Sequence, residues 1–263
     1  MTFARTSQQA FFGTSALLFV ASATLTTVWC GSMSAMGEMP MPGGWTMSMA
    51  WMPMPGKTWA GTAAVFVGMW VVMMVAMMLP SLLPMLWRYR QAVREPGAIH
   101  LDSLTLLVAM GYFCVWIAFG IAAFALGVAL AAAAMQSPPL AQGIPVAAGA
   151  AVVIAGALQF SAWKIRHLDC CRSAPQSARI LRADAGTAWR YGVRLGIHCC
   201  NCCAGLTIVL LVLGVMNLGA MVLVTGAITV ERLAPAATRV ARTIGVAFMG
   251  AGLVLIAKTA GLG

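Results

Sequence analysis

Apolar runs long enough to cross a lipid bilayer recur along the chain, and they constrain its fold more than any other feature. Several of them reach about 20 residues, the length that a helix needs to span the hydrocarbon core. The sequence has 263 residues, of which 61% are hydrophobic and only 8% are charged. A soluble domain is roughly 45–50% apolar. We therefore expect an all-α, polytopic membrane protein with almost no soluble mass.

These runs predict a bundle of about seven transmembrane helices. The predicted spans are 10–30, 60–87, 103–134, 144–163, 192–214, 216–231 and 239–259. The fifth and sixth spans are separated only by a tight turn near Gly214 and Asn217, so they could instead form a re-entrant pair. Asn217 could cap this turn or belong to a polar network.

The first apolar run could also be a signal peptide. It is longer than the usual apolar region of such peptides, and Arg5 is the single basic residue before it. We therefore interpret it as a retained helix. The predicted organisation is a first transmembrane helix (1–30), an external loop rich in Met, Pro and Trp (31–59), and a transmembrane bundle (60–263).

Basic residues predict the orientation of the bundle, because cytoplasmic loops collect Lys and Arg. With the amino terminus inside, 14 of the 16 basic residues fall in inside segments, and only Lys57 and Lys258 fall outside. This asymmetry favours an odd number of spans, with the carboxyl terminus outside. If the cell is a Gram-negative bacterium, the membrane is the inner (plasma) membrane and the outside is the periplasm. It also accounts for the net charge of +10 without a nucleic-acid partner.

The external loop is unusually rich in methionine. Residues 39–59 contain six methionines and four prolines, and the phrase MPMPG occurs twice. Thioether sulfur is a soft, uncharged ligand that suits Cu(I), and M-x-M spacing lets neighbouring sulfurs converge on one ion. The alternative is an adaptable apolar surface at the membrane. The candidate copper ligands here are Met39, Met41, Met52 and Met54.

The second predicted span carries two rows of methionine. Met69, Met73 and Met77 recur every four residues and so share one helical face, and Met74 and Met78 form a second row. Such rows could pass a soft cation along the helix, or they could serve ordinary packing. Of these residues, Met73, Met77 and Met78 are candidate metal ligands.

The most specific pattern is a cluster of cysteine and histidine on the predicted cytoplasmic side. Residues 167–203 hold six cysteines and two histidines. Cys199, Cys202 and Cys203 fall at i, i+3 and i+4, which is one face of a helix. If the fourth and fifth spans are neighbours, His167, Cys170 and Cys171 can face them. The candidate metal ligands of the cluster are His167, Cys170, Cys171, His198, Cys199, Cys200, Cys202 and Cys203.

Soft ligands of this kind favour Cu(I), with zinc or an iron–sulfur cluster as alternatives. We expect Arg166, Arg172 and Arg194 to lower the pKa of the neighbouring thiols. A dithiol redox role and simple packing of small apolar side chains are further alternatives. Glu231 ends the sixth span, where Arg232 is its simplest partner and a role in the inner site is the other interpretation. Cys30 and Cys114 lie outside the cluster, and we interpret both as packing residues.

Several of these motifs together resemble a bacterial family of predicted metal-binding integral membrane proteins, domain of unknown function 2182. The resemblance covers about residues 65–250. It rests on W-x-x-M-x-x-A-M-M-x-P-S (70–81), G-Y-x-x-x-W (111–116), a K-x-x-C-L-x-x-C-R-like element, G-x-x-C-x-x-C-C (196–203), M-N (216–217) and E-x-x-x-P (231–235). It implies metal binding and adds no mechanism.

Two positions depart from the pattern of this family. His167 stands where the family has the first cysteine of its lysine-containing element, and Cys171 matches the second. Asn201 and Ala204 replace a glycine and a tryptophan around the paired cysteines. The change from Cys to His retains a metal ligand and weakens a disulfide-exchange interpretation more than a metal-binding one.

The sequence therefore predicts a membrane protein that binds a soft metal, foremost Cu(I), and acts in copper uptake, trafficking or delivery. The expected partners are the lipid bilayer and a copper chaperone, a cuproenzyme or a larger membrane complex. No ATP-binding motif is present, so we do not expect the chain to pump by itself or to be an enzyme. The alternatives are a membrane thiol- or cofactor-dependent oxidoreductase and a non-catalytic subunit of a membrane complex.

Overall fold

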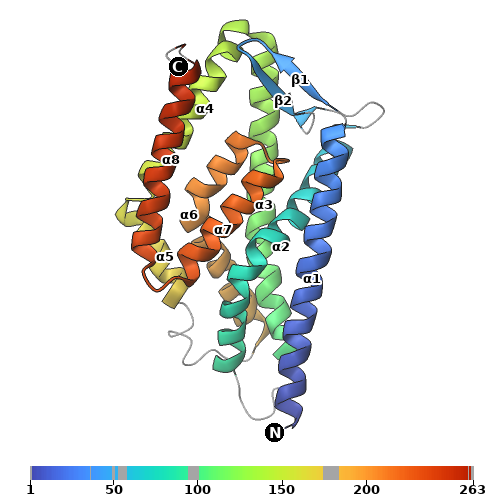
Figure 1. The fold of residues 1–263 in the computed structure, drawn as a ribbon. Helices are drawn as coiled ribbons and strands as arrows, with labels where there is room; N and C mark the ends of the chain where they lie inside the picture. Colours follow the sequence, from blue (N-terminus) through green and yellow to red (C-terminus); the bar gives the residue numbers. More distant parts are fainter. Residues whose placement is uncertain are drawn as a thin grey trace.

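A computed structural model describes residues 2–35, 37–48, 51–52, 58–93, 101–173, 184–259 and 261. These residues form eight α-helices and one two-stranded sheet (Figure 1). The helices are α1 (Thr2–Ala35), α2 (Trp59–Ala92), α3 (Leu101–Gln136), α4 (Pro138–Leu158), α5 (Ala162–Ser173), α6 (Ala185–Leu213), α7 (Leu218–Leu233) and α8 (Ala237–Thr259). The strands are β1 (Glu38–Met41) and β2 (Trp45–Ser48). The all-α bundle is thus confirmed, with the small sheet as an addition.

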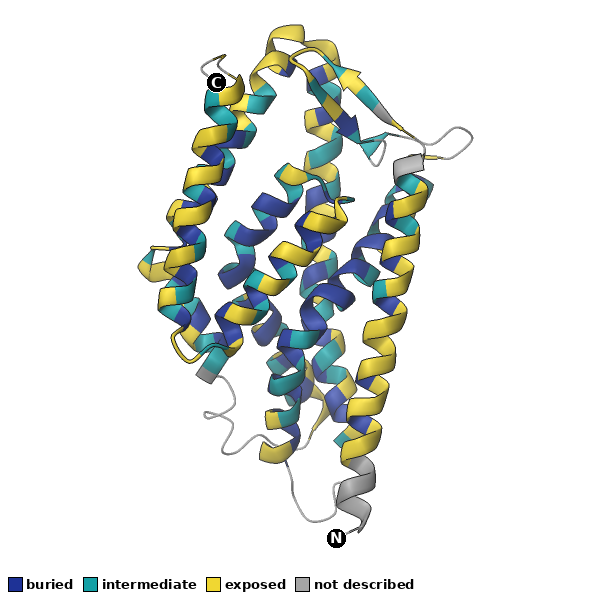
Figure 2. Ribbon diagram, viewed as in Figure 1, coloured by how far each residue is buried: buried dark blue, intermediate teal, exposed yellow. Residues whose placement is uncertain are grey.

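Six helices of the described chain, α1 to α4, α6 and α8, are long and apolar enough to cross a membrane. Figure 2 shows buried residues on the inner faces of the bundle and exposed residues along the outer faces of α1 and α8. Many of the exposed residues are large and apolar, among them Leu17, Val20, Val246 and Leu253. An outer surface of this kind fits lipid better than water.

Helix α7 differs from the other predicted spans. Its 16 residues extend about 24 Å, which is less than the roughly 30 Å of the hydrocarbon core. Figure 1 shows the α6–α7 connection part-way along the bundle. The Asn217 side chain accepts a hydrogen bond from the Ala220 amide at 3.0 Å, so it caps α7 as one interpretation expected. The arrangement fits the re-entrant alternative, and the count of seven spans stays a prediction.

The predicted span 144–163 is interrupted. Helix α4 ends at Leu158, and a separate helix, α5, begins at Ala162. The Ser161 hydroxyl accepts a hydrogen bond from the Lys164 amide at 3.1 Å, which satisfies a free donor at the start of α5. This break gives α5 a direction of its own and places its cysteines and histidine against α6.

Residues 38–48 of the methionine-rich segment form a β-hairpin rather than an irregular loop. Met39 pairs with Met47 and Met41 pairs with Trp45 across the antiparallel strands, so these four side chains share one face. Gly43 and Gly44 turn the chain with positive φ angles of 101° and 74°. The Trp45 indole donates a hydrogen bond of 2.9 Å to the Ala141 carbonyl of α4. The hairpin therefore docks on one end of the bundle.

The two ends of the bundle differ in charge. The amino terminus, the start of α6 and the α7–α8 connection lie at one end, whereas the sheet and the carboxyl terminus lie at the other (Figure 1). Arg88, Arg190 and Arg239 belong to helix ends on the amino-terminal side. This distribution agrees with the predicted orientation, which stays a prediction.

Helices α3 and α6 pack closely at glycines. A Cβ atom at Gly192 of α6 would lie 2.2 Å from the Val108 carbonyl oxygen, and one at Gly196 would lie 2.8 Å from the Tyr112 carbonyl oxygen. Both obstacles are backbone atoms, which cannot rotate away. Glycine at these positions therefore lets α3 approach the cysteine-bearing face of α6.

We expect Gly192→Ala to destabilise the protein by about 1–3 kcal/mol, because the added methyl group forces the two helices apart. Gly250→Ala in α8 is the matched control, since a Cβ there meets nothing within 4 Å. The control should be neutral or gain up to about 1 kcal/mol from helix propensity. Denaturant unfolding in detergent measures both, and equal effects of the two changes would contradict this account of α3–α6 packing.

Candidate metal centre

Four cysteines from two helices meet in the core of the bundle. Cys171 of α5 and Cys199, Cys202 and Cys203 of α6 are at most 1% exposed. Cys202 is central, because its Sγ lies 3.7 Å from that of Cys171 and 3.6 Å from that of Cys203. The predicted spacing on one face of α6 explains the grouping, and α5 supplies the fourth thiol from the opposite side.

The sulfur separations distinguish between the chemistries that this group could support. A disulfide joins sulfur atoms at about 2.05 Å, and none of the eight cysteines, all of which lie in the described residues, forms one. Two thiolates on one tetrahedral ion with bonds of about 2.3 Å lie about 3.8 Å apart, close to the observed separations. Within the described residues, no three His, Cys, Asp or Glu side chains are arranged as a ready-made metal site. Cys202 takes part in both sulfur contacts, so an ion bound between two of these thiols has a third thiol next to it.

A buried arginine faces the thiols. One Nη of Arg232 donates to Cys202 Sγ at 3.5 Å and to Cys171 Sγ at 3.6 Å. The other Nη donates to the Ser81 hydroxyl of α2 at 3.1 Å. A guanidinium is always charged in proteins, and a buried charge needs a partner. The thiols of Cys171 and Cys202 are thus placed where a negative charge is stabilised.

The partner of Glu231 is Lys164 rather than Arg232. Their side chains form an ion pair of 2.7 Å, and both are almost fully buried. Lys164 also donates to the backbone carbonyl of Cys202, which ties the pair to the cysteine helix. The expectation that Arg232 pairs with Glu231 is therefore wrong, because α7 turns these consecutive side chains towards different neighbours.

The arginines expected beside the thiols lie elsewhere. Arg166 and Arg194 are exposed, and Arg172 donates to the backbone carbonyls of Arg232 and Ala234 at 2.9 and 2.6 Å. Arg172 thereby holds the end of α7 against α5, as a basic side chain at a helix carboxyl end can. The hydrogen bond with Cys202, together with burial, raises the pKa of the Cys171 thiol well above its usual value.

Aromatic residues of α3 close one side of the cysteine group. The Tyr112 hydroxyl lies 2.8 Å from Cys199 Sγ. The Trp70 indole donates a hydrogen bond of 2.9 Å to the Trp116 carbonyl, which fixes α2 against α3. The motifs around residues 70 and 112 pointed to these residues, but nothing in the sequence indicated that Tyr112 contacts a thiol.

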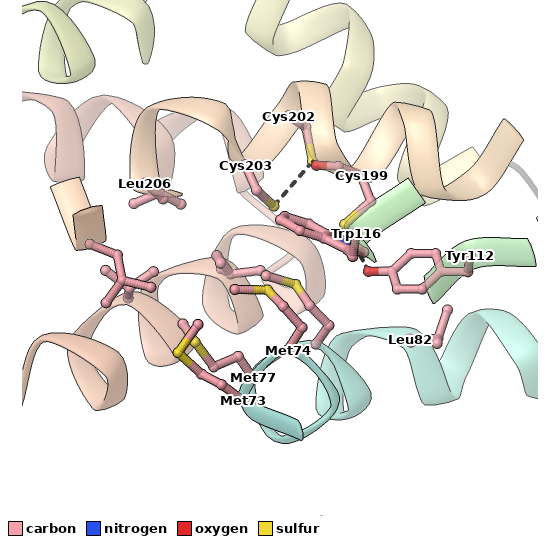
Figure 3. Close-up of a cluster of buried hydrophobic side chains, with 14 of the residues drawn as sticks. Met73, Met74, Met77, Leu82, Tyr112, Trp116, Cys199, Cys202, Cys203 and Leu206 are labelled. Atoms are coloured by element: carbon pink, nitrogen blue, oxygen red, sulfur yellow. Dashed lines mark hydrogen bonds between the residues drawn. The ribbon is translucent and has the colours of Figure 1, made fainter. Parts of the chain in front are cut away.

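The methionines of α2 lie in the same buried cluster. Met73, Met74, Met77 and Met78 are each at most 3% exposed, so they face the interior of the bundle and not lipid. Figure 3 shows Met73, Met74 and Met77 across from Cys203, with Trp116 beside the thiols. Packing remains one role for them, and a soft lining of the cysteine site is the other.

The two histidines form a separate pair beside the cysteine group. The Nδ1 atoms of His167 in α5 and His198 in α6 lie 3.2 Å apart, and both side chains are half-buried. Trp163 contacts the His167 ring edge-on, with 4.9 Å between the ring centroids. The predicted cluster therefore divides into a buried thiol group and a more accessible imidazole pair.

Comparison with known proteins decides the family. The sequence matches the model of a family described as "PpoB2: Copper chaperone" over residues 67–255. The chain belongs to this copper chaperone family. No curated protein and no solved structure matches the chain. The matched region includes the α2 methionines and the cysteine group but not α1 or the sheet.

Other predicted ligands are not part of the four-cysteine group. Cys170 and Cys200 adjoin its members in sequence and are half-buried. Met39 and Met41 belong to the hairpin at one end of the bundle. Met52 follows the hairpin, and Met54 lies outside the described residues.

Removing one member of the Lys164–Glu231 ion pair should leave the other as a buried charge without a partner. We expect Lys164→Met to destabilise the protein by about 3–5 kcal/mol, because Glu231 is left without its counter-charge. The double variant Lys164→Met, Glu231→Leu removes both charges and should recover much of this loss. Thermal unfolding of the two variants in detergent tests this, and a double variant as unstable as the single one would contradict the pairing.

Proposed function

We propose that this chain is an integral membrane copper chaperone of the bacterial inner membrane that carries Cu(I) as its substrate. The ion would bind between Cys171 and Cys202, with Cys203 and Cys199 as the adjacent thiols. The observation that carries the proposal is a buried thiol pair held against a buried arginine in a member of a copper chaperone family. The motif set further supports the resemblance to domain of unknown function 2182.

The buried charges favour a monovalent metal ion. Lys164 and Glu231 neutralise each other, which leaves the positive charge of Arg232 facing the thiols. Cu(I) bound by two thiolates carries one net negative charge and balances this arginine. Zn(II) bound by two thiolates is neutral and would leave Arg232 uncompensated in a medium of low dielectric, which is costly.

The number of ligands around the ion also favours Cu(I) over Zn(II). Structural zinc sites are almost always four-coordinate and tetrahedral. Here Cys202 contacts both Cys171 and Cys203, but no group of three His, Cys, Asp or Glu side chains with the geometry of a metal site is assembled within the described ranges. Cu(I) is stable with two or three soft ligands, so it does not require a fourth ligand in this site.

Thioethers could bring copper to this centre. The hairpin presents Met39, Met41 and Met47 on one face with Trp45, at the end of the bundle that the charge pattern places outside. The buried methionines of α2 belong to the same core cluster as the cysteines. Sulfur ligands of rising affinity along such a route would favour uptake of copper and its delivery to a cuproenzyme or a second chaperone.

The cysteine site is tested by metal content. We expect the purified protein to hold about one Cu(I) per chain, and Cys171→Ser with Cys202→Ser to lose it, because a neutral hydroxyl is a poor ligand for a soft ion. Cys114→Ser is the matched control, since Cys114 is exposed on α3. Elemental analysis after anaerobic loading gives the result.

The other outcomes of this experiment separate the alternatives. Copper that remains in the double-serine variant would contradict the cysteine site. A wild-type protein that holds no metal, but whose alkylation pattern changes with added oxidant, would favour a thiol oxidoreductase. Absence of both metal and redox response, with partner chains copurifying in fixed ratio, would favour a structural subunit.

The α2 methionines give a further prediction. We expect Met73→Leu with Met77→Leu to weaken Cu(I) binding about tenfold, the lower end of the loss seen when groups around a metal are changed. Leucine preserves the apolar volume, so the fold should be retained. Met110→Leu on the exposed face of α3 is the control. Competition with a chromophoric Cu(I) chelator measures the affinity, and unchanged affinity would assign these methionines to packing alone.

A further inference from the structure

Two ligand pairs join α5 to α6, and they are in register. On α5, Cys171 follows His167 by four residues, and on α6, Cys202 follows His198 by four residues. Residues four apart lie one above the other on a helix face. The His167–His198 and Cys171–Cys202 contacts are thus successive levels of one interface, separated by about one helical turn of 5.4 Å.

The imidazole pair has the separation of two ligands on one ion. Metal–nitrogen bonds of about 2.0–2.1 Å in tetrahedral geometry hold two nitrogens about 3.3 Å apart. The Nδ1 atoms of His167 and His198 lie 3.2 Å apart. An ion could therefore enter between them with little movement of either ring, and Trp163 holds one ring in place from its edge.

The histidine pair and the cysteine pair differ in their exposure to solvent and in their softness as metal ligands. Both histidines are half-buried, whereas Cys171 and Cys202 are at most 1% exposed. Imidazole is a harder ligand than thiolate and binds Cu(I) less tightly than two thiolates do. The exposed Arg166 and Arg194 flank the pair with positive charge, which further lowers its affinity for a cation. These properties suit a site that binds copper briefly during transfer rather than one that retains it.

We propose that His167 and His198 form a second, weaker metal site through which Cu(I) exchanges between the exterior of the bundle and the buried thiols. This inference rests on the proposed function of the cysteine pair. In the transfer, two copper–nitrogen bonds break and two copper–sulfur bonds form. The metal stays Cu(I), each of the two thiols gives up its proton as its copper–sulfur bond forms, and both protons leave to water past the half-exposed imidazoles. Departure of copper reverses these steps.

Histidine resonances can report on this site directly, because the sequence contains only three histidines. His100, the histidine outside the pair, serves as the internal control. Protein labelled with ¹⁵N at histidine is titrated anaerobically with Cu(I), which is diamagnetic, while absorbance reports copper–thiolate bonds. We expect the first equivalent to produce the thiolate absorption. A second equivalent should shift the Nδ1 resonances of His167 and His198 together and leave those of His100 in place. His167→Gln should abolish the shift of His198.

The rate of Cu(I) loading tests the role of the two histidines in transfer. We expect His167→Gln and His198→Gln each to slow Cu(I) loading from a chelator about tenfold, in keeping with the effect of lost metal-site groups. Both variants should reach the same final thiolate absorption, which also shows that they are folded. His100→Gln is the control and should load at the wild-type rate.

Each remaining outcome has a distinct meaning. Histidine resonances that do not move with excess Cu(I), or a His167→Gln protein that loads as fast as wild type, would overturn the second site and leave the cysteine site intact. Histidine shifts without any thiolate absorption would overturn the proposed function of the cysteines, and with it the transfer step, while showing an independent imidazole site.

Discussion

The structure depends on buried charge inside an apolar bundle. Lys164, Glu231 and Arg232 bring three charged groups from α5 and α7 to the cysteine face of α6. Charges in such surroundings are tolerated only when each has a partner. Lys164 and Glu231 satisfy each other, and the thiols of Cys171 and Cys202 face Arg232. The need for charge balance thus constrains how α5, α6 and α7 pack, and it underlies the proposal that a soft monovalent ion binds here.

Close helix packing makes this arrangement possible. Glycines on α3 and α6 let the two backbones touch, which brings the Tyr112 hydroxyl to Cys199. Helix α2 adds its methionines to the same core, and Trp70 attaches it to α3. In the proposed site, close packing would hold the sulfur atoms in place, so that little ordering would be left to occur on metal binding. Sites built on helices in this way are better defined than sites on loops.

Further candidate metal ligands surround the thiol group. The buried thioethers of α2 belong to the same core as the thiols, and Met39, Met41 and Met47 of the hairpin share one face. The imidazole pair of His167 and His198 is the more accessible neighbour of the thiols. A carrier must bind its ion tightly enough to protect it and still release it to a partner. Weaker ligands around a strong centre meet both requirements, which is the physical basis of the proposed route.

Hydropathy and helical periodicity in the sequence were enough to predict an all-α membrane bundle, the grouping of Cys199, Cys202 and Cys203 on one face, and the contribution of Cys171. These are local properties, since they depend on the apolar period and on spacing within one helix. The break between α4 and α5, the pairing of Lys164 with Glu231, the contact of Arg232 with the thiols and the division into thiol and imidazole pairs were decided only by tertiary structure. Which neighbour a side chain meets depends on the relative rotation of packed helices, and no spacing within a single helix contains that information.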